Sequence, residues 1–327
     1  MSLFRTEIHP LEPGFKIDYN TSVFLVGSCF VQNIGQKLIN FGFSTYINPF
    51  GVLYNPLSVL NGLNILLSNK VYAAGDLIYY NDIWQSFDHY TGFSDKDQDV
   101  CLGKINTETD RSRKFIKSIN YLILTFGTSW AYKYKENGKV VANCHKMPQS
   151  KFERFFIKSE EIVEAYYLFI SEIRKIVPDL KVIFTVSPVR HLKDGAVGNM
   201  VSKSNLIMAV HQLTDEIPGT VYFPSYEIMM DDLRDYRFYN DDMLHPSDKA
   251  IDYIWEKFNT AFINKDVKFL MKEIFKINQV AGHKPSDHRS ESYQKLISSN
   301  IEKAQNLQQK YGVNLDKIIH ELKSKLL

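Results

Sequence analysis

Short apolar segments alternate with helical patterns along most of this chain, and this alternation restricts the fold more than any other feature. Four apolar runs lie at residues 23–27, 121–127, 181–186 and 221–223. Their length and the turn residues that follow them are typical of buried strands. Between them lie amphipathic patterns such as 159–177, which starts with Ser-Glu-Glu and is closed by a proline. The alternation predicts an α/β fold with a mainly parallel central sheet, covered by helices on both faces.

Two regions depart from this pattern. Residues 70–118 mix short β-like pieces with a charged loop, and we interpret them as an elaboration inserted between core elements. From about residue 266 the chain becomes rich in Lys, Glu and Gln at helical spacing. We therefore predict an α/β domain at 1–265 and a helical C-terminal extension at 266–327. The extension is expected to contribute no catalytic side chain.

Composition argues against several classes of protein. A formal net charge of +2 is too small to predict nucleic-acid binding. There is no run of 18 apolar residues, so we expect no membrane span. The first residues lack the long apolar core of a secretory signal, which predicts a cytoplasmic protein. The three cysteines do not suggest a disulfide framework, and without a CxxC or HExxH motif we predict no metal and no cofactor.

Polar side chains follow the predicted strands at the point where each strand ends. Ser28 and Cys29 come after the first strand, Ser129 after the second, and Arg190 with His191 after the third. In an open parallel sheet, ligands bind beyond the carboxyl ends of the strands. We therefore expect these side chains to gather at one edge of the sheet.

The segment before the last helical pattern of the α/β part reads DDMLHPS, and it places Asp242 and His245 three residues apart. A carboxylate beside a histidine can hold one ring nitrogen so that the other acts as a base. The alternative interpretation is a turn and helix cap made by Asp241, Asp242 and Ser247, with His245 on the surface. Ser28 favours the catalytic interpretation, because a helix N-terminus stabilises negative charge that develops beside it.

These blocks resemble a known family. The stretch VGSCFVQNIGQKL is similar to the motif that names the GSCFA proteins, which belong to the SGNH-hydrolase (GDSL-like esterase) superfamily. The resemblance covers roughly residues 20–262 and continues in order through NPFGVLYNP, TFGTSWAY, NCHKMP, TVSPVRH, YFPSYEIMMDD and DDMLHPS. It implies a three-layer α/β/α sandwich of the SGNH-hydrolase or flavodoxin-like type. By superfamily analogy it also implies esterase or acyl-transfer chemistry.

The resemblance also implies roles for individual residues. Ser28 matches the nucleophilic serine of the first block. His245 matches the general base of the last block, and Asp242 matches the residue that orients it. Gly51, in NPFGV, matches a glycine whose backbone N–H serves the oxyanion hole.

Two departures from the superfamily pattern leave alternatives open. FGTSW stands where the superfamily has G-x-N-D, so one oxyanion donor is missing or is replaced by Ser129 or Asn143. When GSC is aligned column for column with the usual glycine-aspartate-serine of the superfamily's first block, Cys29 rather than Ser28 stands at the nucleophile position. We predict Ser28, because a thiol in apolar surroundings is usually inert. Cys29 is the alternative nucleophile, since it lies near a helix start.

Other polar groups have two interpretations each. Asn143, Cys144 and His145 form either a turn around a buried thiol or a set of substrate contacts. Arg190 and His191 either bind an anionic group of the substrate or lie in solvent.

Taken together, the sequence predicts an SGNH-type hydrolase or acyltransferase with a Ser-His-Asp triad. The substrate would be a small-molecule or carbohydrate ester, such as an O-acylated sugar or cell-envelope glycan. The alternatives are an inactive binding protein that kept the fold, and a thiol enzyme that uses Cys29. The oligomeric state stays open.

Overall fold

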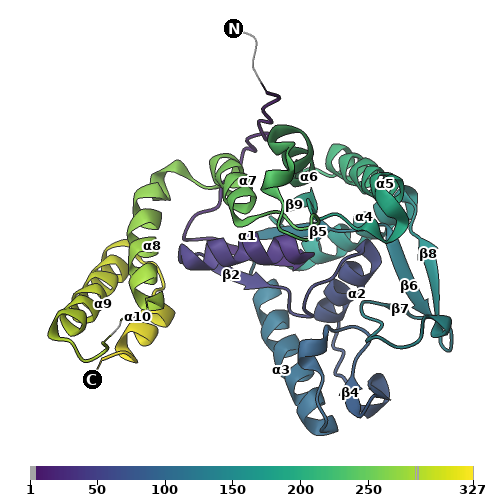
Figure 1. Cartoon of the computed structure of the whole chain (residues 1–327), viewed down its shortest axis with the longest axis horizontal. Helices are drawn as coiled ribbons and strands as arrows, with labels where there is room; N and C mark the ends of the chain where they lie inside the picture. The colour runs from purple at the N-terminus through teal and green to yellow at the C-terminus, as the bar shows by residue number, and fades with distance from the viewer. Residues whose placement is uncertain (1–4, 284, 286, 327) are drawn as a thin grey trace.

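The computed structural model describes residues 5–283, 285 and 287–326. Its centre is a five-stranded sheet, of which Figure 1 labels β2, β5 and β9. The strand order is β10-β9-β5-β1-β2, and every neighbouring pair is parallel. The strands are β1 (Ser22–Gly27), β2 (Ser44–Ile47), β5 (Tyr121–Phe126), β9 (Lys181–Val186) and β10 (Thr220–Phe223). The four runs predicted as strands are β1, β5, β9 and β10, so the predicted α/β class is confirmed.

Helices cover both faces of this sheet, because alternate side chains of each strand point to opposite sides. Phe24 and Val26 of β1 pack into one core, and Val23 and Leu25 pack into the other. The helices on the first side are α2 (Pro56–Leu67), α3 (Gln98–Ile116), α4 (Ser159–Ile176) and α5 (Gly195–Glu216). Those on the second side are α1 (Cys29–Asn40) and α7 (Asp248–Phe262). This is the predicted three-layer α/β/α sandwich.

Two small antiparallel sheets are inserted between these elements. One is a hairpin of β3 (Ile78–Tyr80) and β4 (Ile83–Gln85). The other follows β5 directly and has the order β7-β6-β8, from β6 (Trp130–Tyr134), β7 (Val140–Val141) and β8 (Phe152–Phe156). After β10, the short helix α6 (Ser225–Glu227) continues into a π-helical turn at Ile228–Leu233. The second sheet was not predicted from the sequence.

Residues 70–118 contain a long helix that sequence analysis missed. Helix α3 begins after Asp97, whose carboxylate caps the N–H groups of Asp99 and Val100. Two of its buried positions are polar, Thr109 and Ser112. Their hydroxyls donate to main-chain carbonyls one turn earlier, at 2.7 Å, and so need no water. These polar residues interrupt the apolar period on which the prediction relied.

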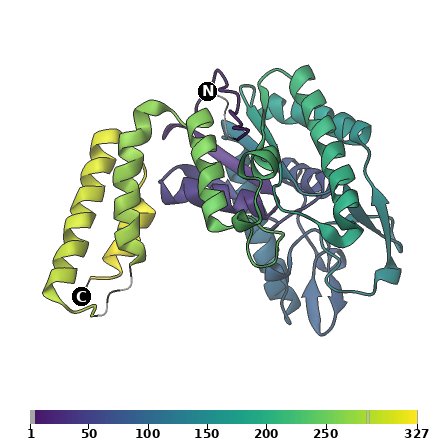
Figure 2. The same cartoon turned by 45° about the horizontal axis from the view of Figure 1, so that its top comes forward.

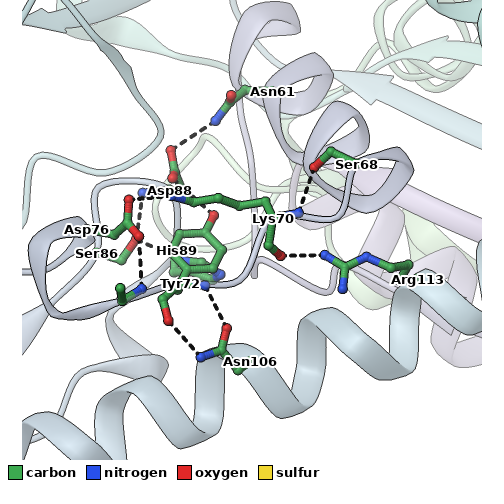
Figure 3. Close-up of polar contacts among 11 residues, drawn as sticks. Asn61, Ser68, Lys70, Tyr72, Asp76, Ser86, Asp88, His89, Asn106 and Arg113 are labelled. Atoms are coloured by element: carbon green, nitrogen blue, oxygen red, sulfur yellow. Dashed lines mark hydrogen bonds and ion pairs between the residues drawn. The ribbon is translucent and has the colours of Figure 1, made fainter.

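Polar contacts fasten the inserted segment 70–93 to α2 and α3 (Figure 3). Asp88 accepts hydrogen bonds from Asn61 of α2 (2.9 Å) and from the hydroxyl of Tyr72 (3.1 Å). The backbone of Tyr72 exchanges two hydrogen bonds with the amide of Asn106 on α3, each 2.9 Å long. Burial raises the pKa of the Asp88 carboxyl. These contacts anchor the inserted segment to both helices.

The C-terminal extension is helical, as predicted. It contains α8 (Lys268–Gly282), α9 (Glu291–Tyr311) and α10 (Asp316–Lys323), which share a core of their own. Figure 2 shows these helices side by side at one end of the molecule. Phe275 of α8 stacks on Phe41 with ring centres 4.9 Å apart, and Asn278 donates to the carbonyl of Asn40 (3.0 Å). The extension thus packs on the α1 side of the sandwich.

None of the described helices combines the length and the apolar character needed to cross a membrane.

Candidate functional site

The tip of β1 is held tightly against its neighbours. The N–H of Gly27 donates to the side-chain oxygen of Asn48 (2.8 Å), and its carbonyl accepts from the N–H of Leu53 (3.0 Å). Gly27 has φ +145°, and a Cβ built on it would lie 2.2 Å from the carbonyl oxygen of Thr125 in β5. Only glycine allows this approach, which brings the first residues of α1 to the end of the sheet.

We expect Gly27→Ala to destabilise the fold strongly. The added methyl group would meet backbone rather than a movable side chain, and the backbone angle disfavours any L-residue. Strain and overpacking together should lower the free energy of unfolding by about 3 kcal/mol or more. Urea unfolding measures this change. Gly14→Ala is the matched control, because a Cβ there meets nothing within 4 Å. Equal losses for the two variants would contradict the prediction.

Ser28 and Cys29 have different surroundings. Ser28 is the N-cap of α1 and is 1% exposed; its Oγ accepts from the N–H of Phe30 (3.4 Å) and its own N–H donates to Thr125 (3.3 Å). Cys29 is the first residue of α1 and is only half-buried. Its Sγ lies 3.7 Å from the hydroxyl of Tyr54. The serine is therefore engaged in local structure, and the thiol is the more accessible of the two.

Asp242 and His245 form a close pair in the loop before α7. The Oδ2 atom of Asp242 lies 2.6 Å from Nδ1 of His245, and Oδ1 accepts the backbone N–H groups of Leu244 and His245, both at 2.9 Å. The bond from the N–H of His245, then that from Leu244, and then the imidazole contact lower the pKa of Asp242 to about 2. The carboxylate therefore stays ionised at neutral pH. It fixes one ring nitrogen and leaves the other, Nε2, free to act as a base.

Backbone hydrogen bonds bring the strand-end loops together. The carbonyl of Tyr54 accepts the N–H groups of Gly127 (2.7 Å) and Thr128 (3.0 Å), which join the loop after β2 to the tip of β5. The N–H of Arg190 donates to the carbonyl of Leu244 (3.1 Å), which joins the loop after β9 to the loop of His245.

Between these loops opens a cleft of about 680 Å³. Five of the predicted site residues line it: Ser28, Cys29, Asn143, Arg190 and His245. Asp242 contacts the cleft through His245. The described residues that line it all lie between positions 28 and 245, so the extension adds none to it.

Three other predicted residues, Gly51, Ser129 and His145, are not among the described residues of this lining. The N–H of Gly51 donates to the carbonyl of Asn48 (2.8 Å), which argues against the oxyanion role expected for it. A Cβ on Gly51 would lie 2.1 Å from the ring of Tyr90, so this glycine makes room for that side chain.

Ser129 and His145 are both buried and hydrogen-bonded to the protein. The Oγ of Ser129 donates to the carbonyl of Ser202 (2.9 Å) and accepts from Asn205 (2.9 Å), which fastens the β5–β6 turn to α5. The Nε2 atom of His145 lies 2.7 Å from the carbonyl of Ser86, and burial lowers the pKa of its imidazole. Both contacts favour structural roles.

Apart from Trp130, which directly follows a predicted strand, the aromatic residues of the cleft were not anticipated from the sequence. Tyr54, Tyr90, Trp130 and Tyr132 line the cleft from three separate segments. Three of them stand within or directly after quoted family blocks, but nothing in their spacing marks an aromatic as exposed to a ligand rather than packed. His191, one of the strand-end residues expected at this edge of the sheet, does line the cleft, and its Nε2 is buried without a partner among the described residues.

Burial sets the protonation of several cleft residues. It lowers the pKa of His191 to about 4, with Lys203 and His245 adding smaller effects, so this imidazole is neutral at pH 7. Burial raises the pKa of the Cys144 thiol to about 11, which leaves that thiol protonated and unreactive. Burial, followed by the nearby Cys29, raises the pKa of Tyr54 to about 12.

The described residues include no group of three or more His, Cys, Asp or Glu side chains arranged to hold a metal ion.

Two protein-family models match the chain. A model described as "GSCFA family" matches residues 22–258, and one described as "GSCFA domain protein, C-terminal domain" matches residues 274–327. The chain belongs to the GSCFA family. The family predicted from the sequence motifs is thereby confirmed, and the described residues that line the cleft all lie within the first of these two matches. Comparison with curated protein sequences finds no match.

Solved structures similar to this GSCFA protein include three carbohydrate-active esterases. A family two carbohydrate esterase from Clostridium thermocellum, in complex with cellohexaose, has 12% identity and TM-score 0.35, over 80% of this chain and 66% of that one. A carbohydrate esterase family 3 protein from Talaromyces cellulolyticus has 11% identity and TM-score 0.35, over 77% of this chain and 99% of that one. The acetyl xylan esterase Est2A from Butyrivibrio proteoclasticus has 11% identity and TM-score 0.36, over 74% of this chain and 63% of that one. The chain spans less than two thirds of the length of the first and third of these structures.

Proposed function

We propose that the cleft carries out acyl transfer from an ester, as a hydrolase or an acyltransferase. The observation that carries the proposal is the Asp242–His245 pair, 2.6 Å apart, at a cleft that also exposes a nucleophile at the tip of β1. His245 would take the proton of the nucleophile as it attacks the ester carbonyl. It would then return that proton to the leaving alcohol. Water or a hydroxyl group would accept the acyl group in the second step.

The nucleophile in this proposal is Cys29, with Ser28 as the alternative. Cys29 is half-buried and lies in the cleft, whereas the hydroxyl of Ser28 already caps α1. The position of Cys29 as the first residue of α1 adds support, because the positive end of a helix stabilises a thiolate. The serine nucleophile predicted from the sequence stays a prediction.

Two groups are suited to hold the oxyanion. The N–H groups in the first turn of a helix have no acceptor within the helix, and that of Cys29 lies at such an end. The second group is the amide of Asn143, which lines the cleft. Its oxygen accepts the N–H of His145 (2.8 Å), and its NH2 group has no partner among the described residues. Asn143 would thus replace the asparagine absent from FGTSW.

The aromatic lining supports a carbohydrate as one part of the substrate. Tyr54, Tyr90, Trp130 and Tyr132 offer apolar ring faces together with polar tips. Such side chains bind ligands that carry both apolar C–H faces and hydroxyl groups, as sugars do. A deacetylase or acetyltransferase acting on a glycan would use these features.

The proposal is tested with a panel of 4-nitrophenyl esters and acetylated sugars, assayed with the wild type and with His245→Ala. Hydrolysis, or transfer to an added sugar, that is lost in the variant supports the proposal. If no ester is consumed and neither iodoacetamide nor a fluorophosphonate labels residues 28–29, the cleft is a binding site. The engaged N–H of Gly51 and the buried hydroxyl of Ser129 favour that rival, because both were expected oxyanion donors.

Asp242→Ala should reduce kcat less than loss of His245 does. The variant leaves the imidazole in place but removes the bond that fixes its tautomer, so we expect a loss of about a hundredfold. Because the pKa of Asp242 is about 2, this orienting role should persist across assays from pH 5 to 9. Asp241→Ala is the matched control, since Asp241 is the exposed neighbouring carboxylate. A control variant as slow as Asp242→Ala would contradict the assignment.

A further inference from the structure

The cleft carries an excess of positive charge. Its charged lining residues are Arg154, Arg190, Lys193 and Asp194. Arg154 and Asp194 form two parallel hydrogen bonds, at 2.6 and 2.5 Å, and so neutralise each other. The nearby carboxylate of Asp242 is used by the ring and backbone of His245. Among the described residues, no carboxylate forms an ion pair with Arg190 or Lys193, so both remain as unpaired cations.

Arg190 is held in place by groups that leave its charge unpaired. Its backbone N–H donates to Leu244 (3.1 Å), directly before His245. Its guanidinium lies over the ring of Tyr239, 5.4 Å from the ring centre, and one NH2 group contacts the sulfur of Met230 (3.7 Å). The Nε atom is buried and has no hydrogen-bond partner among the described residues. A guanidinium that is held in place while its charge stays unpaired is suited to bind an oxyanion.

Lys193 adds a second positive charge on the same loop. Its ammonium group donates to the hydroxyl of Tyr132 (2.5 Å), an aromatic of the cleft wall, and lies 5.1 Å from the ring centre. Neither contact neutralises it. In a cleft with low-dielectric walls, two cations of this kind attract and orient a negatively charged ligand.

We propose that the ester bound in this cleft carries an anionic group, a carboxylate or a phosphate, which Arg190 binds beside His245 with Lys193 assisting. This inference rests on the proposed acyl-transfer function of the same cleft and narrows its substrate class. The anionic group belongs to the part of the substrate that stays intact, and it would hold the ester carbonyl in reach of Cys29.

The first test does not depend on catalysis. Iodoacetate and iodoacetamide alkylate thiols by the same displacement, but only iodoacetate is an anion. We expect Arg190→Gln to lower the ratio of the iodoacetate rate to the iodoacetamide rate at Cys29 by about tenfold. This is the size of one lost charge-assisted contact. Peptide mass separates Cys29 from Cys144. The rate with iodoacetamide should not change, which also shows that the variant is folded.

Matched variants sharpen this test. Arg237→Gln removes the same charge from an exposed arginine outside the described lining of the cleft, so its ratio should equal that of the wild type. Lys193→Gln should lower the ratio by a smaller factor than Arg190→Gln does. Arg190→Lys keeps the positive charge, so it should retain part of the preference for iodoacetate. Equal or unmeasurable rates for the two reagents in the wild type would overturn the inference. A ratio that Arg190→Gln leaves unchanged would do the same.

The second test compares substrates. The wild type should cleave 4-acetoxybenzoate and 4-acetoxyphenyl phosphate about tenfold faster than methyl 4-acetoxybenzoate, measured as kcat/KM, and Arg190→Gln should remove the preference. The two anionic esters distinguish a carboxylate from a phosphate. If none of the three is cleaved, the proposed function fails and the alkylation ratio still decides the anion site. Cleavage of all three at equal rates would overturn the anion site and leave the acyl-transfer function standing.

Discussion

Replacing His245 by alanine is expected to lower kcat/KM for short acyl esters by at least about a thousandfold, because a positioned general base contributes that much to acyl transfer. The imidazole is the base of the proposed mechanism, and Asp242 contacts its Nδ1 at 2.6 Å. The side chain lines the cleft and is 44% exposed, so its loss should leave the fold stable. A fluorogenic acetate ester measures the rate, and the thermal midpoint of unfolding measures the stability.

His320→Ala is the matched control for this experiment. His320 is an exposed histidine on α10, in the extension that adds no described residue to the cleft. Its replacement should leave kcat/KM unchanged. If His245→Ala kept most of the wild-type activity, the hydrolysis would not depend on this base, and the role given to Asp242 would fall with it.

The sequence was sufficient to predict the centre of the fold, because buried parallel strands are continuous apolar runs. β5, for example, is buried at all six positions. The edge strand β2 lacks that signal: Ser44 is exposed and the next three residues are half-buried. α3 was missed for a related reason, since Thr109 and Ser112 fill buried positions with hydroxyls that bond to their own helix. Strands and helices could be predicted where their buried positions carry an uninterrupted pattern of apolar side chains.

The candidate site was predictable where its geometry is local. Asp242 and His245 are three residues apart, so their contact follows from one turn of chain. The contacts of Gly51 and Ser129 depend instead on distant partners, Tyr90 and Ser202 among them, which no local spacing encodes. For the same reason the small sheet β7-β6-β8 and its cleft aromatics could not be foreseen from the strand-end rule.

Cys29→Ala is expected to lower kcat/KM at least about a thousandfold, whereas Ser28→Ala should keep activity within about tenfold of the wild type. The thiol lies in the cleft at the first residue of α1, and the serine hydroxyl caps that helix. Loss of the cap should lower the free energy of unfolding by about 1 kcal/mol, which urea titration resolves. Iodoacetamide should label Cys29 and abolish activity in parallel.

The double variant Cys29→Ala/His245→Ala tests whether the nucleophile and its base act as a unit. With either group gone, the other has no proton to exchange, so the double variant should be hardly slower than each single variant. Rates that multiply would mean that the two residues act independently. If Ser28→Ala were folded yet inactive, and a fluorophosphonate labelled Ser28, the nucleophile would be the serine predicted from the sequence. In that case Cys29 would serve the oxyanion through its N–H alone, and Cys29→Ala, which keeps that N–H, would remain active.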